Sequence, residues 1–150
     1  MRALIQRVAW AKVEVAQQPV GSVARGLMIL LGVGPEDSES QAEALAQKVS
    51  KLRIFNDEQG KMNLSVRDIA GAALVVSQFT LYADCRKGNR PSFVRAAAPD
   101  HAEALYQHFV HSLQQLGIDV ATGRFATHMQ VSLCNDGPVT IWLDSEALGL

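Results

Sequence analysis

The sequence lacks the features that would tie it to a membrane, to disulfide bonds or to a structural metal. Its only two cysteines, Cys85 and Cys134, lie far apart and form neither a disulfide framework nor a zinc-binding pair. No apolar run reaches the ~18–20 residues of a membrane span, and Gln6 and Arg7 interrupt the apolar start before it could be a signal peptide. With 48% hydrophobic and 19% charged residues, the composition excludes intrinsic disorder. We expect a soluble, cytoplasmic, single-domain protein over residues 1–150 that does not bind membranes.

Common nucleotide-binding and hydrolase motifs are missing too. Gly32 and Gly34 are followed by Asp37, where the dinucleotide-binding fingerprint needs a third glycine. Neither a phosphate-binding P-loop nor the G-x-S-x-G motif of many serine hydrolases occurs. Three of the four histidines fall toward the solvent side of a predicted helix, with no cysteine or carboxylate to complete a metal site: His101, His108 and His111. We expect no metal ion and no cofactor.

The apolar residues follow patterns that are typical of strands and of two helices. Alternating or continuous apolar runs predict strands at 12–15, 27–33, 73–81, 129–133 and 139–143. Ser38 and Gln41 form a capping box for a helix over 39–53, and a second helix runs from Pro99 to Gly117. Turn residues predict breaks at 19–21, 56–60 and 135–138. Together these elements predict a strand-rich α/β domain with mixed β-sheets and two main helices.

The net charge is only −1, but the positive charges are unevenly placed. Four cations, with no acid among them, lie in the predicted loop over 83–98: Arg86, Lys87, Arg90 and Arg95. A short cationic loop on a near-neutral protein suits local contact with a polyanion. The same charges also fit an ordinary solvated surface loop.

Polar residues interrupt a predicted buried strand at Ser77, Gln78, Phe79 and Thr80. Buried polar groups need partners, and the end of a buried strand often opens onto a ligand cleft. If the segment is extended, Ser77 and Phe79 face one way while Gln78 and Thr80 face the other. The two hydroxyls are candidate nucleophiles, but no histidine adjoins them in sequence. A polar strand end packed against a turn remains the simpler alternative.

The second unusual segment is Asn135-Asp136-Gly137-Pro138-Val139-Thr140. The Gly137–Pro138 bond can be cis at modest cost, and a cis bond in a tight turn sets its carbonyl groups in an unusual direction. The composition of the segment, taken alone, favours a plain hairpin turn.

These two segments together resemble the D-aminoacyl-tRNA deacylase family, formerly called the D-tyrosyl-tRNA deacylases. The resemblance extends over the whole chain through further short strings: Ala3 to Val8, Gly60 to Leu64, Arg90 to Phe93, Thr122 to Phe125 and Met129 to Leu133. It implies a layered α/β/β fold and a homodimer. It also implies hydrolysis of the ester that joins a D-amino acid, or glycine, to the terminal adenosine of tRNA.

The resemblance further implies roles for particular residues. Gly137-Pro138 would be a cis turn inserted across the dimer interface to reject L-amino acids. The catalytic pocket that receives it would be lined by Ser77, Gln78, Phe79 and Thr80. Arg7 would hold the turn, Met129 would support the pocket and Phe125 would pack near the adenine.

Physical reasoning fits this selectivity. Rigid carbonyl oxygens close to Cα leave room for hydrogen but not for carbon, so the site excludes L-residues and admits D-residues and glycine. No activating base is evident in the sequence. The resemblance implies that the terminal 2′-hydroxyl of tRNA assists the attack of water, and we expect this in preference to a covalent Thr80 intermediate. Backbone N–H groups near Phe79 and Thr80 would stabilise the oxyanion.

The expected partner is aminoacylated tRNA and not DNA, with its phosphates contacted by Arg86, Lys87, Arg90 and Arg95. Two other functions stay open. The chain could be a dimeric tRNA-binding module without catalysis, or a serine or threonine esterase of small metabolites.

Overall fold

The first strand, β1 (Arg2–Val15), is the centre of the sheet in a computed structural model that describes all 150 residues. Three antiparallel partners flank it: β2 (Gln18–Val23), β3 (Gly26–Gly32) and β8 (Gln130–Asp144). Two strands then extend the sheet in parallel from β3: β6 (Ala72–Ser77) and β7 (Asp119–Thr122). The six strands form a mixed sheet, as the sequence predicts.

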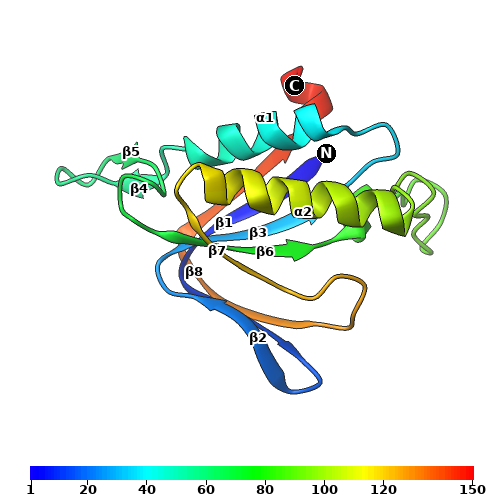
Figure 1. Cartoon of the computed structure of the whole chain (residues 1–150), viewed down its shortest axis with the longest axis horizontal. Helices are drawn as coiled ribbons and strands as arrows, with labels where there is room; N and C mark the ends of the chain where they lie inside the picture. The colour runs from blue at the N-terminus through cyan, green and yellow to red at the C-terminus, as the bar shows by residue number, and fades with distance from the viewer.

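The connections between the parallel strands carry the helices. α1 (Glu39–Ser50) and the small hairpin of β4 (Phe55–Asn56) and β5 (Met62–Leu64) lie between β3 and β6. The 3-10 helix η1 (Phe79–Tyr82) and α2 (Pro99–Gln115) lie between β6 and β7. Figure 1 shows α1 and α2 side by side over one face of the sheet. A third, short helix, α3 (Ser145–Leu148), ends the chain and was not predicted.

Local signals place the two long helices. The Ser38 amide donates to Gln41 Oε1 at 2.7 Å, which confirms the capping box at the start of α1. The helix ends at Ser50, three residues before the predicted end at 53. α2 starts at Pro99, and Gly117 follows its end with a φ of +82°, a conformation that favours glycine.

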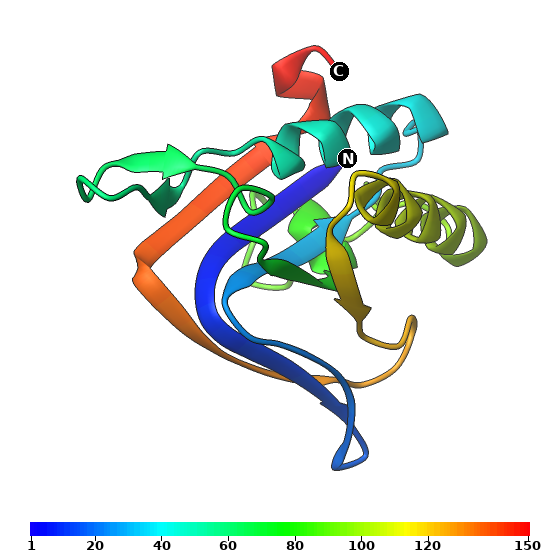
Figure 2. The ribbon, with the colours of Figure 1, turned by 60° about the vertical axis from the view of Figure 1, so that its left-hand side comes forward.

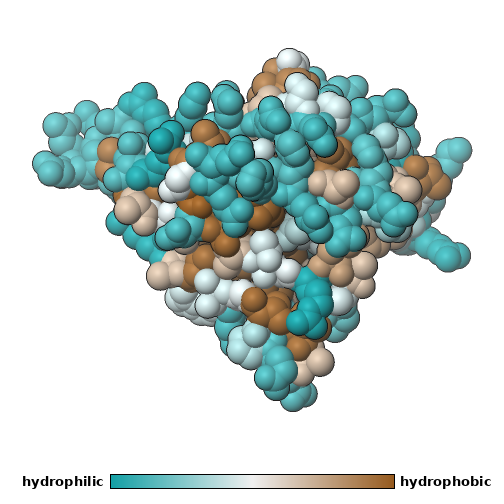
Figure 3. Space-filling model, in the orientation of Figure 1, coloured by the Kyte–Doolittle hydropathy of each residue, from teal (hydrophilic) through white to brown (hydrophobic).

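The main core lies between these helices and the sheet. The apolar faces of both helices are buried against β1, β3 and β6: Ala42, Leu45, Ala46 and Val49 from α1, and Leu105, Phe109 and Leu113 from α2. Each large apolar side chain buried in this way contributes roughly 1.5–3 kcal/mol. The outer surfaces of the two helices are mostly hydrophilic, with apolar atoms visible beneath them (Figure 3). No helix is long and apolar enough to span a membrane.

The sheet curls until its two ends almost meet, as Figure 2 shows. β2 approaches β7 so closely that a Cβ on Gly21 would overlap the carbonyl oxygen of Thr122. Inside the curl lies a second, smaller core: Val8, Ala11, Val13, Met28, Leu74 and Val76. The sheet is therefore nearly barrel-like.

Three local predictions were wrong. The first tight turn is at Ala16 and Gln17, which have φ angles of 48° and 64°, so residues 19–21 belong to β2 instead of to a turn. The strand predicted over 73–81 ends at Ser77, and Phe79–Tyr82 is a 3-10 helix. Residues 130–144 form one strand without a hairpin at 135–138. In the first and third cases, pairing with β1 overrides the local turn signal.

Candidate active site

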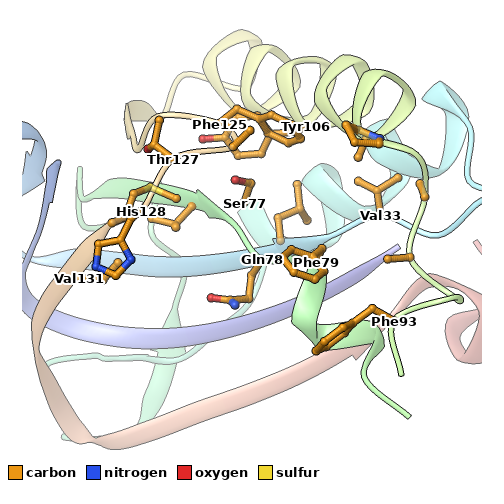
Figure 4. A pocket seen from close by; sticks show the side chains of 18 residues that line it. Val33, Ser77, Gln78, Phe79, Phe93, Tyr106, Phe125, Thr127, His128 and Val131 are labelled. Carbon is orange, nitrogen blue, oxygen red and sulfur yellow. The ribbon is translucent and has the colours of Figure 1, made fainter. Parts of the chain in front are cut away.

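A cavity of about 660 Å³ opens beside the end of β6. Its walls come from β3, the β6–η1 junction, the start of α2 and the segment over 125–131. Thirteen of its 18 lining residues are hydrophobic, so the cavity suits a flat apolar group with a few polar contacts. Figure 4 shows Ser77 near the middle, with Tyr106 and Phe125 on one side and Gln78 and Phe79 on the other.

The junction between β6 and η1 brings three of the predicted residues to this cavity: Ser77, Gln78 and Phe79. The Gln78 amide still donates to the carbonyl oxygen of Leu31 in β3 at 2.8 Å, and the chain then turns into η1. The alternation of side chains that we expected beyond Ser77 is wrong, because the backbone is no longer extended. The Ser77 hydroxyl makes no hydrogen bond within the chain.

Thr80 lies on η1 but outside the residues that line the cavity. Its Oγ1 accepts a hydrogen bond from the side-chain amide of Gln78. As the first residues of a helix, Phe79 and Thr80 have backbone N–H groups without an acceptor inside that helix.

No general base is hydrogen-bonded to either of the two hydroxyls. His128 lines the far side of the cavity in Figure 4, and no histidine is hydrogen-bonded to Ser77 or Thr80. The Tyr106 hydroxyl donates to the carbonyl oxygen of Val75 at 2.8 Å, and burial raises its pKa to about 12. Tyr106 is therefore neutral at physiological pH. No group of three or more metal-binding side chains occurs in the structure.

Phe125 and Met129 form the wall opposite η1. The Phe125 ring lies 5.9 Å from that of Tyr106, centroid to centroid. Met129 packs on Gly123, where an added Cβ would come within 2.6 Å of its sulfur. A larger residue at 123 would therefore displace Met129.

The Gly137–Pro138 segment is a bulge in β8, and its peptide bond is cis. Asn135 pairs with Val8 and Thr140 with Gln6, so four residues of β8, 136–139, lie opposite a single residue of β1. The extra length makes the chain protrude, and Gly137 and Pro138 are exposed. Neither of them lines the cavity of its own chain.

Arg7, the residue of β1 opposite the bulge, is only 8% exposed. Its Nε donates to the carbonyl oxygen of Asp136 at 3.0 Å, and its Nη1 donates to that of Ile54 at 2.6 Å. Asn135 closes the base of the bulge, since its Nδ2 donates to the carbonyl oxygens of Arg7 at 2.9 Å and Val139 at 3.0 Å. The bulge is thus a rigid projection.

The basic loop borders the cavity, because Phe93, Ala96 and Ala97 from this loop are among its lining residues. All four predicted cations are exposed: Arg86, Lys87, Arg90 and Arg95. Arg86 is paired with Asp84 just outside the cluster, at 2.9 Å between Nε and Oδ1, and this pair holds the pKa of Asp84 well below its usual range. Residues 86–95 contain no acidic residue, so the charge pattern of this range did not predict the pairing of Arg86 with Asp84.

Sequence reasoning also missed Tyr106 and Phe93. Tyr106 reads as one more apolar position of a helix, so only its burial beside the cavity marks it. Phe93 lies in a string that supports the family resemblance, but its place at the cavity mouth depends on how the loop folds back.

Comparisons with known proteins agree over nearly the whole chain. A family model described as D-Tyr-tRNA(Tyr) deacylase matches residues 4–144. A D-aminoacyl-tRNA deacylase of Thermotoga petrophila is 60% identical over 148 residues, which cover 99% of both chains. One of Chloroherpeton thalassium is 58% identical and covers 97% of this chain and 96% of its own.

Two solved structures have a similar fold. One, described as the c-Myc DNA Unwinding Element Binding Protein, has a TM-score of 0.90 at 39% identity, over 96% of this chain and 98% of its own. The other, described as a probable eukaryotic D-amino acid tRNA deacylase, has a TM-score of 0.82 at 18% identity, over 95% of this chain and 97% of its own.

Proposed function

Because this chain belongs to the D-Tyr-tRNA(Tyr) deacylase family and is a D-aminoacyl-tRNA deacylase, we propose that it works as a homodimer with shared active sites. The bulge at Gly137–Pro138 of each subunit enters the cavity of its partner. One observation carries this proposal: the bulge is rigid and exposed, yet it lies outside the cavity of its own chain. A second copy of the chain supplies the missing wall.

The bulge acts as a steric filter for chirality. An L- and a D-amino acid differ only in which side of Cα carries the side chain. Backbone carbonyl groups held close to Cα accept hydrogen on their side and exclude carbon, so L-residues are rejected without recognition of the side chain. Glycine carries hydrogen on both sides, and the enzyme therefore hydrolyses glycyl-tRNA as well as many D-aminoacyl-tRNAs.

Hydrolysis relies on the positioning of the aminoacyl ester by the protein and on a hydroxyl group of the substrate itself. Ser77, Gln78 and Phe79 hold the aminoacyl ester, and Thr80 supports them through its contact with Gln78. The 2′-hydroxyl of the terminal adenosine assists the attack of water, because the cavity offers no paired histidine and nucleophile. Fixed geometry alone lowers a barrier by about 7–11 kcal/mol in the best cases. The backbone amides of Phe79 and Thr80 stabilise the developing oxyanion.

The remaining predicted residues hold the RNA. Phe125 packs on the terminal adenine and Met129 supports that wall, consistent with their place in the cavity. Lys87, Arg90, Arg95 and, more weakly, the paired Arg86 contact phosphates of aminoacylated tRNA. We place this activity in translation quality control in the cytoplasm, with tRNA and not DNA as the nucleic-acid partner.

A paired assay tests the proposal. D-tyrosyl-, L-tyrosyl- and glycyl-tRNA are incubated with equal amounts of protein, and release of the amino acid is followed. We expect rapid release from the D- and glycyl esters and only the spontaneous rate from the L-ester. Equal release from the D- and L-esters would contradict the filter. Binding of tRNA without any release would instead indicate a binding module.

A further inference from the structure

We propose that Phe93 and Phe79 form a stacking platform at the cavity mouth for the nucleobase that precedes the terminal adenosine of tRNA. The inference rests on the proposed function and extends it from the terminal nucleotide to its neighbour. Phe93 has no role in the proposed function.

Phe79 and Phe93 are the two exposed phenylalanine side chains of the five in this chain. Phe79 is 57% exposed and Phe93 is 37% exposed, whereas Phe55 and Phe109 are fully buried. Their centroids lie 5.1 Å apart with an interplanar angle of 73°, an edge-to-face pair. Figure 4 shows both rings at one side of the cavity, opposite His128. An aromatic pair left open to solvent beside a cavity is a ready surface for a flat ligand.

The backbone fixes Phe93 from both sides, although it lies in a long loop. Just before it, Ser92 and Asp84 exchange two backbone hydrogen bonds of 2.9 and 2.8 Å. Just after it, the Ala96 amide donates to the carbonyl oxygen of Phe93 at 3.0 Å, and the Ala97 amide donates to that of Val33 at 2.9 Å. The backbone that carries the ring is therefore held in place before any ligand arrives, which reduces the entropic cost of binding.

The charge around the pair indicates a nucleic acid as the occupant. Lys87, Arg90 and Arg95 of the same loop form no ion pair within the chain. Cationic side chains beside exposed aromatic rings are the combination that binds single-stranded nucleic acids, where phosphates meet the charges and bases stack on the rings. The end of an aminoacyl-tRNA is single-stranded. With its terminal adenine inside the cavity, the preceding base reaches the mouth.

The test compares variants in steady-state deacylation of D-tyrosyl-tRNA. Phe93→Ala is matched with Val94→Ala, since Val94 is the next residue, is 86% exposed and does not line the cavity. We expect Phe93→Ala to raise KM by about 5- to 150-fold, the range for the loss of one base stack, with kcat little changed. Val94→Ala leaves both constants unchanged, and Phe93→Tyr restores KM because it keeps the ring.

A second substrate identifies the stacked base. D-tyrosyl-tRNA that lacks the base of the nucleotide before the terminal adenosine should have a raised KM with the wild type and no further increase with Phe93→Ala. An unchanged KM for Phe93→Ala, or an equal loss on the abasic substrate, would overturn the proposal. A weaker dimer for Phe93→Ala in analytical ultracentrifugation would also overturn it, because the ring would then contact the partner subunit. Wild-type turnover of D-tyrosyl-tRNA, measured in parallel, reports separately on the proposed function.

Discussion

The guanidinium of Arg7 donates a hydrogen bond from Nε to the carbonyl oxygen of Asp136 at 3.0 Å. This contact joins the centre of the sheet to the residue that directly precedes Gly137. The same guanidinium also reaches the carbonyl oxygen of Ile54. The buried core of the protein, and not a flexible loop, therefore sets the position of the exposed bulge.

Arg7→Lys should loosen the bulge. A lysine cannot reproduce the two directed hydrogen bonds of the guanidinium, so we expect a loss of roughly 2 kcal/mol in the free energy of unfolding. We also expect faster release from L-tyrosyl-tRNA. The matched control is Arg2→Lys on the same strand, which loses comparable contacts to Asp144 and the Leu81 carbonyl. If both variants still reject the L-ester, Arg7 has only a structural role.

Thr80→Ala should keep a substantial share of the activity on D-tyrosyl-tRNA. The hydroxyl of Thr80 lies outside the cavity lining and only accepts a hydrogen bond from Gln78, so its loss should lower kcat by no more than about 10-fold. Single-turnover kinetics would check this. A complete loss of hydrolysis, with folding and tRNA binding intact, would favour a covalent Thr80 intermediate.

Reversing the charge of single residues in the basic loop should weaken tRNA binding to different extents. Lys87→Glu and Arg90→Glu each remove a free cation, and each should weaken tRNA binding and reduce the slope of log affinity against log salt by about 1. Arg86→Glu should have a smaller effect on affinity, because Asp84 already neutralises that arginine. Filter binding over a series of salt concentrations measures both quantities. Equal affinities and slopes for all variants and the wild type would show that the loop does not contact phosphates.

Because Tyr106 is buried, the free energy of unfolding should fall at alkaline pH. Burial raises its pKa in the folded state to about 12, whereas an unfolded tyrosine ionises near ~10. Above pH ~10 only the unfolded state loses this proton, so the free energy of unfolding should fall by roughly 2 kcal/mol between pH ~10 and ~12. Urea unfolding of Tyr106→Phe should show a smaller fall over this window. Burial also raises the pKa of Tyr82, so part of the fall remains in the variant.

Local patterns in the sequence were enough to predict the two long helices and the buried strands. The capping box of Ser38 and Gln41 and the proline at 99 act within a single turn, so they can be recognised without the rest of the fold. The same holds for the apolar runs of β3 and β6. Composition, charge and periodicity therefore predicted the α/β class correctly.

Long-range pairing could not be predicted in this way. Asn135 to Pro138 has the composition of a hairpin turn, and only the pairing of both flanks with β1 makes it a bulge. The Arg7 contact to Ile54 is equally invisible to periodicity. The cavity joins residues from four distant segments. The motifs of the family resemblance pointed to Ser77 and Gly137, whereas the geometry of the pocket required the structure.

The most direct test of the shared active site is a mixed dimer. One subunit carries Gly137→Ala, whose Cβ would lie 2.8 Å from a Val139 methyl and 3.0 Å from Arg7 Nη2 and would displace the bulge. The other subunit carries Ala96→Trp, which fills its own cavity but leaves its bulge intact.

The purified mixed dimer then has one open cavity, in the Gly137→Ala subunit, and one intact bulge, in its partner. We predict that it hydrolyses D-tyrosyl-tRNA and rejects L-tyrosyl-tRNA, while the Gly137→Ala homodimer releases both. Release of L-tyrosine by the mixed dimer at half the rate of that homodimer would show that each bulge serves its own subunit, and would contradict the account.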